Sequence, residues 1–149
     1  MFGNSVTTTE CKKVFLDTAP IIYFLDDHFV YGEKAALIFD QFLLLGSKMF
    51  TSVITAEEYL VYPMRDNNWE KVDVFFQFRD FYKIDLVPIS LEIAKKAASI
   101  RAKYPSFKSM DALQLAVAVI MDGDLFLTND KQLKQFNEIP CITIDEWIM

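Results

Sequence analysis

The chain has 149 residues, of which 52% are hydrophobic, and this length and composition suit a single domain with one packed core. Its 21 acidic and 15 basic residues give a net charge of −6, the wrong sign for a protein that binds nucleic acid mainly by neutralising phosphates. Two cysteines without paired spacing, no leader pattern and no apolar run of spanning length predict a reduced, cytoplasmic protein that does not enter a membrane.

The predicted elements alternate between short strands and helices. We interpret residues 1–12, which are rich in small polar residues, as a flexible tail, and residues 13–149 as one folded domain. Short apolar runs bounded by turn and capping residues predict five strands, at residues 13–16, 49–54, 84–87, 125–128 and 141–144. The helical segments between them predict an α/β fold, a three-layer α/β/α sandwich around a mostly parallel five-stranded sheet.

Local signals predict where two of the helices begin and end. Thr55 and Glu58 have the spacing of a capping box, and Pro63 is expected to close that helix within about two turns. The next helix, from about residue 67 to residue 82, has apolar side chains on two faces, so we expect one face to pack on the sheet and the other on a partner. Candidate contact residues, for which core packing is an equal alternative, are Phe39, Phe42, Tyr59, Tyr62 and the Phe75–Tyr82 segment.

Four acidic residues lie where predicted strands are followed by predicted helices: Asp17, Glu58, Asp111 and Asp130. The carboxyl ends of parallel strands lie along one edge of a sheet, so we expect these acids to share one cleft, close enough to coordinate common ions. Each acid also has an ordinary explanation, as a helix cap or as a first-turn acid that favours the helix dipole. The two interpretations are compatible, because helices that follow parallel strands begin at the same edge.

A set of carboxylates without histidine or cysteine contains only hard oxygen ligands, which suit Mg²⁺ or Mn²⁺ better than zinc. One or two such ions would activate a water and stabilise the leaving oxygen of a phosphodiester, so we expect phosphodiester hydrolysis. The ions would also reverse the local potential that disfavours nucleic acid. His28 is the only histidine, which argues against a multi-histidine site or a serine-hydrolase triad, and we interpret it as a surface residue.

Four segments of the chain contain the acids and their neighbours: Val14–Thr18, Thr51–Glu58, Met110–Ala116 and Leu127–Asp130. These segments resemble the PIN-domain nucleases, and among these most of all the VapC-type toxin ribonucleases. The resemblance runs from about residue 13 to residue 144. It implies a PIN-like domain with endoribonuclease activity that depends on Mg²⁺ or Mn²⁺ and leaves 5′-phosphate and 3′-hydroxyl ends. It also implies an antitoxin protein as partner and a homodimer.

The same resemblance implies roles for individual residues. The four acids would be catalytic and metal-binding, and Thr128 would support the last of them. Glu58 is selected over Glu57 because the family places its second acid six residues after the strand serine, which is Ser52 in this chain.

Basic residues concentrate between positions 95 and 108, where five of the 15 fall. Lys108, Lys103 and Arg101 are candidate contacts for substrate phosphates, and a solvated helix face is the alternative. For the chain as a whole, the rival interpretation is a catalytically silent PIN-fold module that binds protein or RNA and uses its acids as caps. The presence of all four acids argues against this rival.

Overall fold

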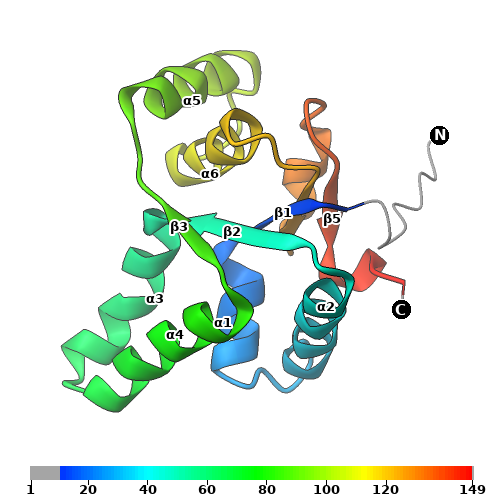
Figure 1. Ribbon diagram of the computed structural model, residues 1–149. Coiled ribbons are helices and arrows are strands. Elements are labelled where there is room, and N and C mark those ends of the chain that lie inside the picture. Colours follow the sequence, from blue (N-terminus) through cyan, green and yellow to red (C-terminus); the bar gives the residue numbers. More distant parts are fainter. Residues whose placement is uncertain (1–10, 149) are drawn as a thin grey trace.

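The computed structural model describes residues 11–148, so most of the predicted tail, residues 1–10, lies outside the described part of the chain. In that part, parallel strands form the middle layer in the order β3-β2-β1-β4-β5 (Figure 1). Their bounds are β1 (Lys13–Leu16), β2 (Lys48–Ser52), β3 (Asp85–Val87), β4 (Leu125–Thr128) and β5 (Cys141–Thr143). Because every pairing is parallel, the carboxyl ends of all these strands lie at one edge of the sheet.

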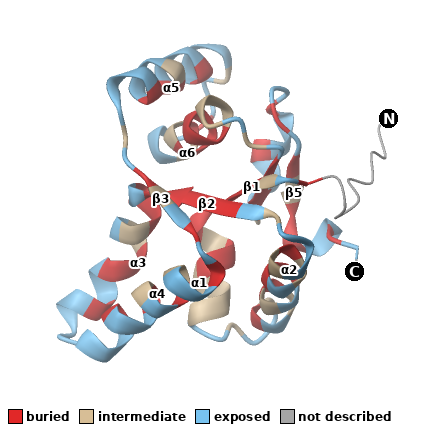
Figure 2. Cartoon of the chain, in the orientation of Figure 1, coloured by how far each residue is buried: buried red, intermediate tan, exposed pale blue. Residues whose placement is uncertain are grey.

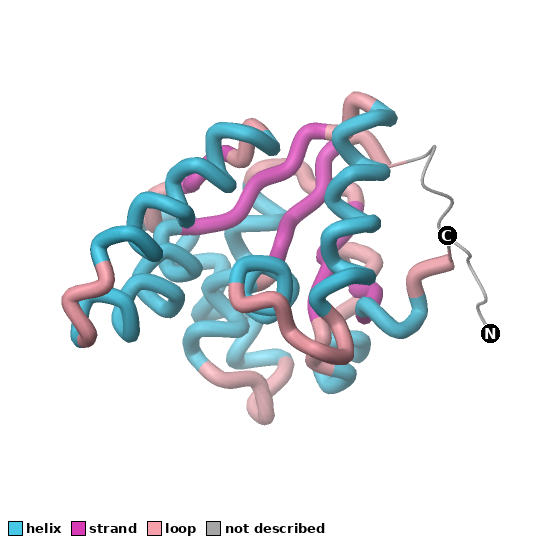
Figure 3. Tube along the Cα trace, turned by 90° about the horizontal axis from the view of Figure 1, so that it is seen from below, coloured by secondary structure: helices cyan, strands magenta, loops and turns pink. Residues whose placement is uncertain are grey.

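Helices cover both faces of the sheet (Figures 1 and 3), which confirms the predicted three-layer α/β/α sandwich. One face carries α1 (Thr18–Leu25), α2 (Gly32–Leu45), α3 (Val53–Arg65) and α4 (Trp69–Tyr82). The other face carries α5 (Leu91–Lys103) and α6 (Ser109–Ile120). Two 3₁₀ helices, η2 (Lys131–Gln135) and η3 (Ile144–Glu146), lie on either side of β5 in the sequence. Within residues 11–148 no helix has the length and apolar character needed to cross a bilayer.

Side chains that alternate along the central strands divide the core between the two faces of the sheet. Val14 and Leu16 of β1 pack on the side of α1 to α4, whereas Phe15 packs on the side of α5 and α6. Phe15 stacks on Phe126 of β4, with the ring centroids 4.9 Å apart. The central strands are buried along most of their length (Figure 2), as expected for a parallel sheet covered on both sides.

The folded part of the chain begins before the predicted boundary at residue 13. Cys11 is buried against the core, and the backbone N–H of Lys12 donates to Oδ2 of Asp124 at 3.0 Å. The same carboxylate oxygen accepts the N–H of Lys13 at 3.0 Å. Asp124 therefore ties the start of β1 to the turn that precedes β4, and the prediction of a flexible tail was wrong for residues 11 and 12.

The boundary between β2 and α3 differs from the prediction. The strand ends at Ser52, two residues early, because the Ser52 hydroxyl caps α3 by accepting the N–H of Ile54 at 3.1 Å. Thr55 is consequently buried inside the helix and is not its cap. Pro63 does not close the helix either, since α3 continues to Arg65. A proline removes one backbone donor, and at Pro63 the following turn still forms.

The aromatic residues divide between the core and the surface. Helix α4 buries one face against the rest of the domain, while Val74 and Phe81, on the face that we expected to contact a partner, are 38% and 65% exposed. Among the candidate contact residues, Phe39, Phe42 and Tyr59 are buried in the core, while Tyr62 is 64% exposed. The spacing of the buried α4 residues is that of a single helical face: Val72, Phe75, Phe78 and Tyr82.

His28 is half-buried, which corrects its interpretation as a surface residue. Its Nδ1 accepts the backbone N–H groups of Val30 and Tyr31, at 3.2 and 3.1 Å, and its ring packs on Tyr23 with centroids 4.7 Å apart. The imidazole therefore holds the turn between α1 and α2.

Candidate active site

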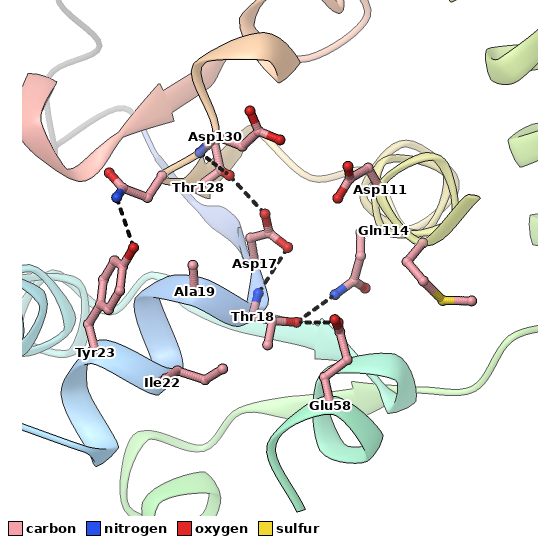
Figure 4. Close-up of a pocket in the computed structure, with 12 residues that line it drawn as sticks. Asp17, Thr18, Ala19, Ile22, Tyr23, Glu58, Asp111, Gln114, Thr128 and Asp130 are labelled. Atoms are coloured by element: carbon pink, nitrogen blue, oxygen red, sulfur yellow. Dashed lines mark hydrogen bonds between the residues drawn. The ribbon is translucent and has the colours of Figure 1, made fainter. Parts of the chain in front are cut away.

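A cavity of about 450 Å³ opens at the carboxyl edge of the sheet. It lies where β1 and β4 end and where α1 and α6 begin, with the second turn of α3 on one side. All four predicted acids line it, so the prediction of one shared cleft is confirmed. In the view of Figure 4, Asp111 and Glu58 approach Asp17 from different helices, and Asp130 lies beyond Thr128.

Asp17 is the innermost of the four acids and also the N-cap of α1. Its Oδ1 accepts the N–H of Thr18 at 2.9 Å, and its Oδ2 accepts the hydroxyl of Thr128 at 2.8 Å. The pKa of Asp17 is raised from 3.8 to about 6, chiefly by burial and also by the nearby charges of Asp111 and Glu58, against the two hydrogen bonds that lower it. The negative charge of Asp17 is therefore poorly stabilised at this position.

Glu58 reaches the same cavity from α3. It is half-buried, and its Oε1 accepts the hydroxyl of Thr18 at 2.8 Å. Glu57 is exposed and does not line the cavity. The structure thus places at the cavity the glutamate that the spacing from Ser52 selects.

Asp111 and Asp130 complete the acidic wall of the cavity. Asp111 lies in the first turn of α6, where burial, the charge of Asp130 and the charge of Glu58 raise its pKa, while Lys108 lowers it. Asp130 is exposed, and its Oδ1 accepts the N–H of Gln132 at 3.0 Å, which caps η2. Asp130 is therefore the outermost acid, at the mouth of the cavity.

Polar residues beneath the acids form a buried network that the sequence did not lead us to expect. Gln114 of α6 lines the cavity and is 1% exposed. Its amide nitrogen donates to the hydroxyls of Thr55, at 2.9 Å, and Thr18, at 3.3 Å. The only local signal was a glutamine within the apolar run of α6. Its partners lie in two other helices, so the sequence alone could not pair them.

The chemistry of the donors fits a hard divalent cation. Carboxylates and hydroxyls supply only oxygen ligands, and none of the described residues that line the cavity is basic. The acids raise one another's pKa, so a cation among them would relieve their repulsion. However, no three His, Cys, Asp or Glu side chains in residues 11–148 are grouped as they would be around an ion. We expected the four carboxylates to lie close enough together to coordinate common ions, and in this structure they are farther apart than that.

The candidate phosphate contacts lie outside the cavity. Lys108 immediately precedes α6, and its charge reaches Asp111, whereas Arg101 and Lys103 occupy the last turn of α5. All three side chains are exposed. Their positions are compatible both with a rim for substrate phosphates and with a solvated helix end.

The sequence also matches a known family over most of its length. The PIN domain family profile matches residues 14–139. The chain belongs to the PIN domain family. No curated protein matches it.

Solved structures resemble this PIN domain along nearly their whole length. A chain from a toxin-antitoxin complex of Klebsiella pneumoniae is 18% identical with a TM-score of 0.68, and the match covers 88% of this chain and 97% of that one. A chain of VapBC2 from Rickettsia felis, bound to a DNA fragment from its promoter, is 15% identical with a TM-score of 0.69, and the match covers 88% of this chain and 98% of that one. A chain of DNA-bound VapBC from Salmonella typhimurium is 21% identical with a TM-score of 0.65, and the match covers 89% of this chain and 98% of that one. At these identities the likeness establishes the PIN fold.

Proposed function

We propose that this PIN domain is an endoribonuclease that depends on Mg²⁺ or Mn²⁺ and acts in the cytoplasm as the toxin of a toxin–antitoxin pair. The observation that carries the proposal is that four acids from four separate segments line one cavity at the carboxyl edge of the sheet. Capping accounts for Asp17 and Asp130. It does not account for Glu58, because Ser52 caps α3, nor for Asp111, because Lys108 occupies the cap position of α6.

The residues of the cavity have separable roles in this proposal. Asp17, Glu58, Asp111 and Asp130 would hold the cation, which when bound supplies positive charge and lowers the pKa of an attacking water. Thr128 keeps Oδ2 of Asp17 in place through its hydrogen bond. Because the described lining contains no basic side chain, a phosphodiester can approach these acids only if their charge is neutralised.

The toxin assignment draws on the solved relatives, which are described as a toxin-antitoxin complex and as VapBC bound to DNA. We extend this to propose that an antitoxin protein binds this chain and that the chain forms a homodimer. Exposed apolar side chains are available for such contacts, with Phe29 95% and Leu44 87% exposed. Light scattering on the purified chain, with and without its co-expressed genomic neighbour, tests both partners.

Cleavage of mixed RNA substrates tests the enzymatic proposal. Cleavage is expected in Mg²⁺ or Mn²⁺, and it should stop when a chelator is added or when Asp17 is changed to Asn. Sequencing the product ends should show 5′-phosphates and 3′-hydroxyls. Cleavage that persists in chelator, or full activity of Asp17→Asn, would rule out the metal mechanism. No cleavage of RNA under any condition would favour the silent binding module.

A further inference from the structure

Five buried polar side chains form a network under Glu58, between the end of β2 and helices α1, α3 and α6. Each is at most 8% exposed, so each polar atom needs a partner inside the protein. Gln114 is the central member, because it contacts three of the others. The members are Thr18, Thr51, Ser52, Thr55 and Gln114.

The orientation of the Gln114 amide is set from the side of β2. The Ser52 hydroxyl accepts the backbone N–H of Ile54, and its own proton is donated to Oε1 of Gln114. With the carbonyl oxygen of Gln114 facing Ser52, its NH₂ group faces Thr55 and Thr18, at 2.9 and 3.3 Å. Gln114 therefore offers a donor, and no acceptor, to those two hydroxyls.

The hydroxyl protons then have only one consistent arrangement. Thr18 has a single proton, and an ionised Glu58 can only accept, so Thr18 donates to Oε1 of Glu58 at 2.8 Å. Thr55, 3.0 Å away, must donate to Thr18, and Thr51 must donate to Thr55 at 2.8 Å. Both lone pairs of Thr18 are then filled, by Thr55 and Gln114. The chain of hydroxyls points its last proton at Glu58.

We propose that Gln114 is a positioning residue for Glu58. It fills an acceptor site on Thr18 and so prevents the Thr18 hydroxyl from turning back toward the network, which holds the Glu58 carboxylate against Thr18 at the wall of the cavity. Within residues 11–148, the Gln114 side chain makes hydrogen bonds to Ser52, Thr18 and Thr55 and none to Glu58 or another acid. The inference rests on the proposed function in so far as Glu58 binds the cation there.

The test compares Gln114→Met, which keeps the length of the side chain and removes its hydrogen bonds, with the wild type. The readouts are the Mn²⁺ affinity by calorimetry, the kcat and KM for RNA, and the position of Glu58 in a crystal structure. Supporting groups behind metal ligands typically contribute about 10- to 100-fold to affinity or activity. We expect a loss of Mn²⁺ affinity and of kcat in that range, an unchanged KM, and a displaced Glu58 carboxylate.

Two further comparisons separate positioning from general loss of structure. Thr18→Ser keeps the hydroxyl and should bind Mn²⁺ more tightly than Thr18→Val, which lacks it. Ile100 of α5 is buried on the face of the sheet opposite Glu58 and is not a member of the network, so at a similar melting temperature Ile100→Ala should keep the Mn²⁺ affinity of the wild type.

Several outcomes would overturn the inference. They are wild-type Mn²⁺ affinity and an unmoved Glu58 in Gln114→Met, an equal loss of affinity in Ile100→Ala, or equal affinities of Thr18→Ser and Thr18→Val. If Gln114→Met does not fold, the Thr18 pair decides. If the wild type cleaves no RNA, the proposed function fails, but the position of Glu58 in the crystals of Gln114→Met still decides whether Gln114 positions it.

Discussion

The hydroxyl of Thr128 donates to Oδ2 of Asp17 at 2.8 Å, across the boundary between β4 and β1. The hydroxyl oxygen of Thr128 also accepts the backbone N–H of Asp130 at 3.1 Å. One buried hydroxyl therefore links the innermost acid of the cavity to the outermost one.

Replacing Thr128 with Val should destabilise the protein. The change leaves Asp17 without this donor in a buried site, a loss that costs about 1–3 kcal/mol, and it leaves the part-buried N–H of Asp130 without this acceptor. The destabilisation should be larger at pH 7.5 than at pH 4, because the lost hydrogen bond lowers the pKa of Asp17 and so favours its charged form. Urea unfolding measures both effects. Thr128→Ser keeps the hydroxyl, and an equal loss of stability in the two variants would contradict the prediction.

Asp17→Asn should make the cation-free protein more stable at neutral pH. The pKa of Asp17 is raised from 3.8 to about 6, so between these values the folded state binds more protons than the unfolded state, and stability falls as pH rises. At pH 7.5, well above the folded-state pKa, the penalty is complete and amounts to about 3 kcal/mol. An asparagine could place its oxygen toward the N–H of Thr18 and its NH₂ toward the hydroxyl oxygen of Thr128.

Melting temperatures in chelator at pH 4 and pH 7.5 provide the measurement for Asp17→Asn. The variant should melt at a higher temperature than the wild type at pH 7.5, with a much smaller difference at pH 4. Taking the difference between the two proteins at each pH removes the contributions of titrating groups that do not interact with Asp17. Asp111 interacts with Asp17 electrostatically, so the relief of their repulsion is part of the expected gain. A gain of the same size at both values would mean that the charge of Asp17 is not its cause.

Glu58→Gln and Glu57→Gln form a matched pair at neighbouring positions. Gln at position 58 can still accept the Thr18 hydroxyl but lacks the negative charge, so we expect cleavage of RNA to fall by on the order of 100-fold. Glu57 is exposed and outside the cavity, and its substitution should leave the rate unchanged. Single-turnover cleavage in Mn²⁺ compares them, and an equal effect of the two changes would reject Glu58 as the second acid.

Lys108→Gln should weaken RNA binding. Each lysine that neutralises a phosphate contributes about 1 to the slope of log affinity against log salt, so the variant should lose about that much. Binding is best measured by fluorescence anisotropy over a range of salt, with Asp17→Asn present in both proteins to prevent cleavage. Lys48→Gln is the control, because Lys48 is exposed at the amino end of β2, at the opposite edge of the sheet. Equal slopes for the two variants would favour the solvated-face interpretation.

The sheet could be predicted where the local pattern and the tertiary structure agree. β1 and β4 have the predicted bounds, because each is a short apolar run that ends directly at a polar residue of the cavity edge. The predicted second strand extended two residues beyond the end of β2, because Val53 and Ile54 are apolar and β-branched and continue the strand pattern. What ends the strand is the Ser52 hydroxyl, which caps α3 and contacts Gln114, a residue 62 positions away in the sequence.

The candidate site was predictable for a similar reason, and only in part. Asp17 and Asp130 follow strands directly and Glu58 lies six residues after β2, and the parallel topology brings the ends of strands together whatever the intervening sequence is. Asp111 lies in α6, which follows α5 and not a strand, so this reasoning does not account for its position. The network around Gln114 depends on side-chain directions in three helices, and a single glutamine in an apolar helix does not carry that information. The mutual distances of the carboxylates likewise depend on rotamers, which strand and helix patterns do not determine.

Asp17 differs from the other acids in how its backbone is held. Its N–H donates to the carbonyl oxygen of Leu127 at 2.9 Å, so the residue is anchored to the hydrogen-bond ladder between the two central strands. Glu58 and Asp111 project from helices, and Asp130 follows β4 at an exposed position. Any contraction of the cavity around a bound cation must therefore come from these three acids closing on Asp17, which makes Asp17 the fixed reference point of the site and the others its adjustable part.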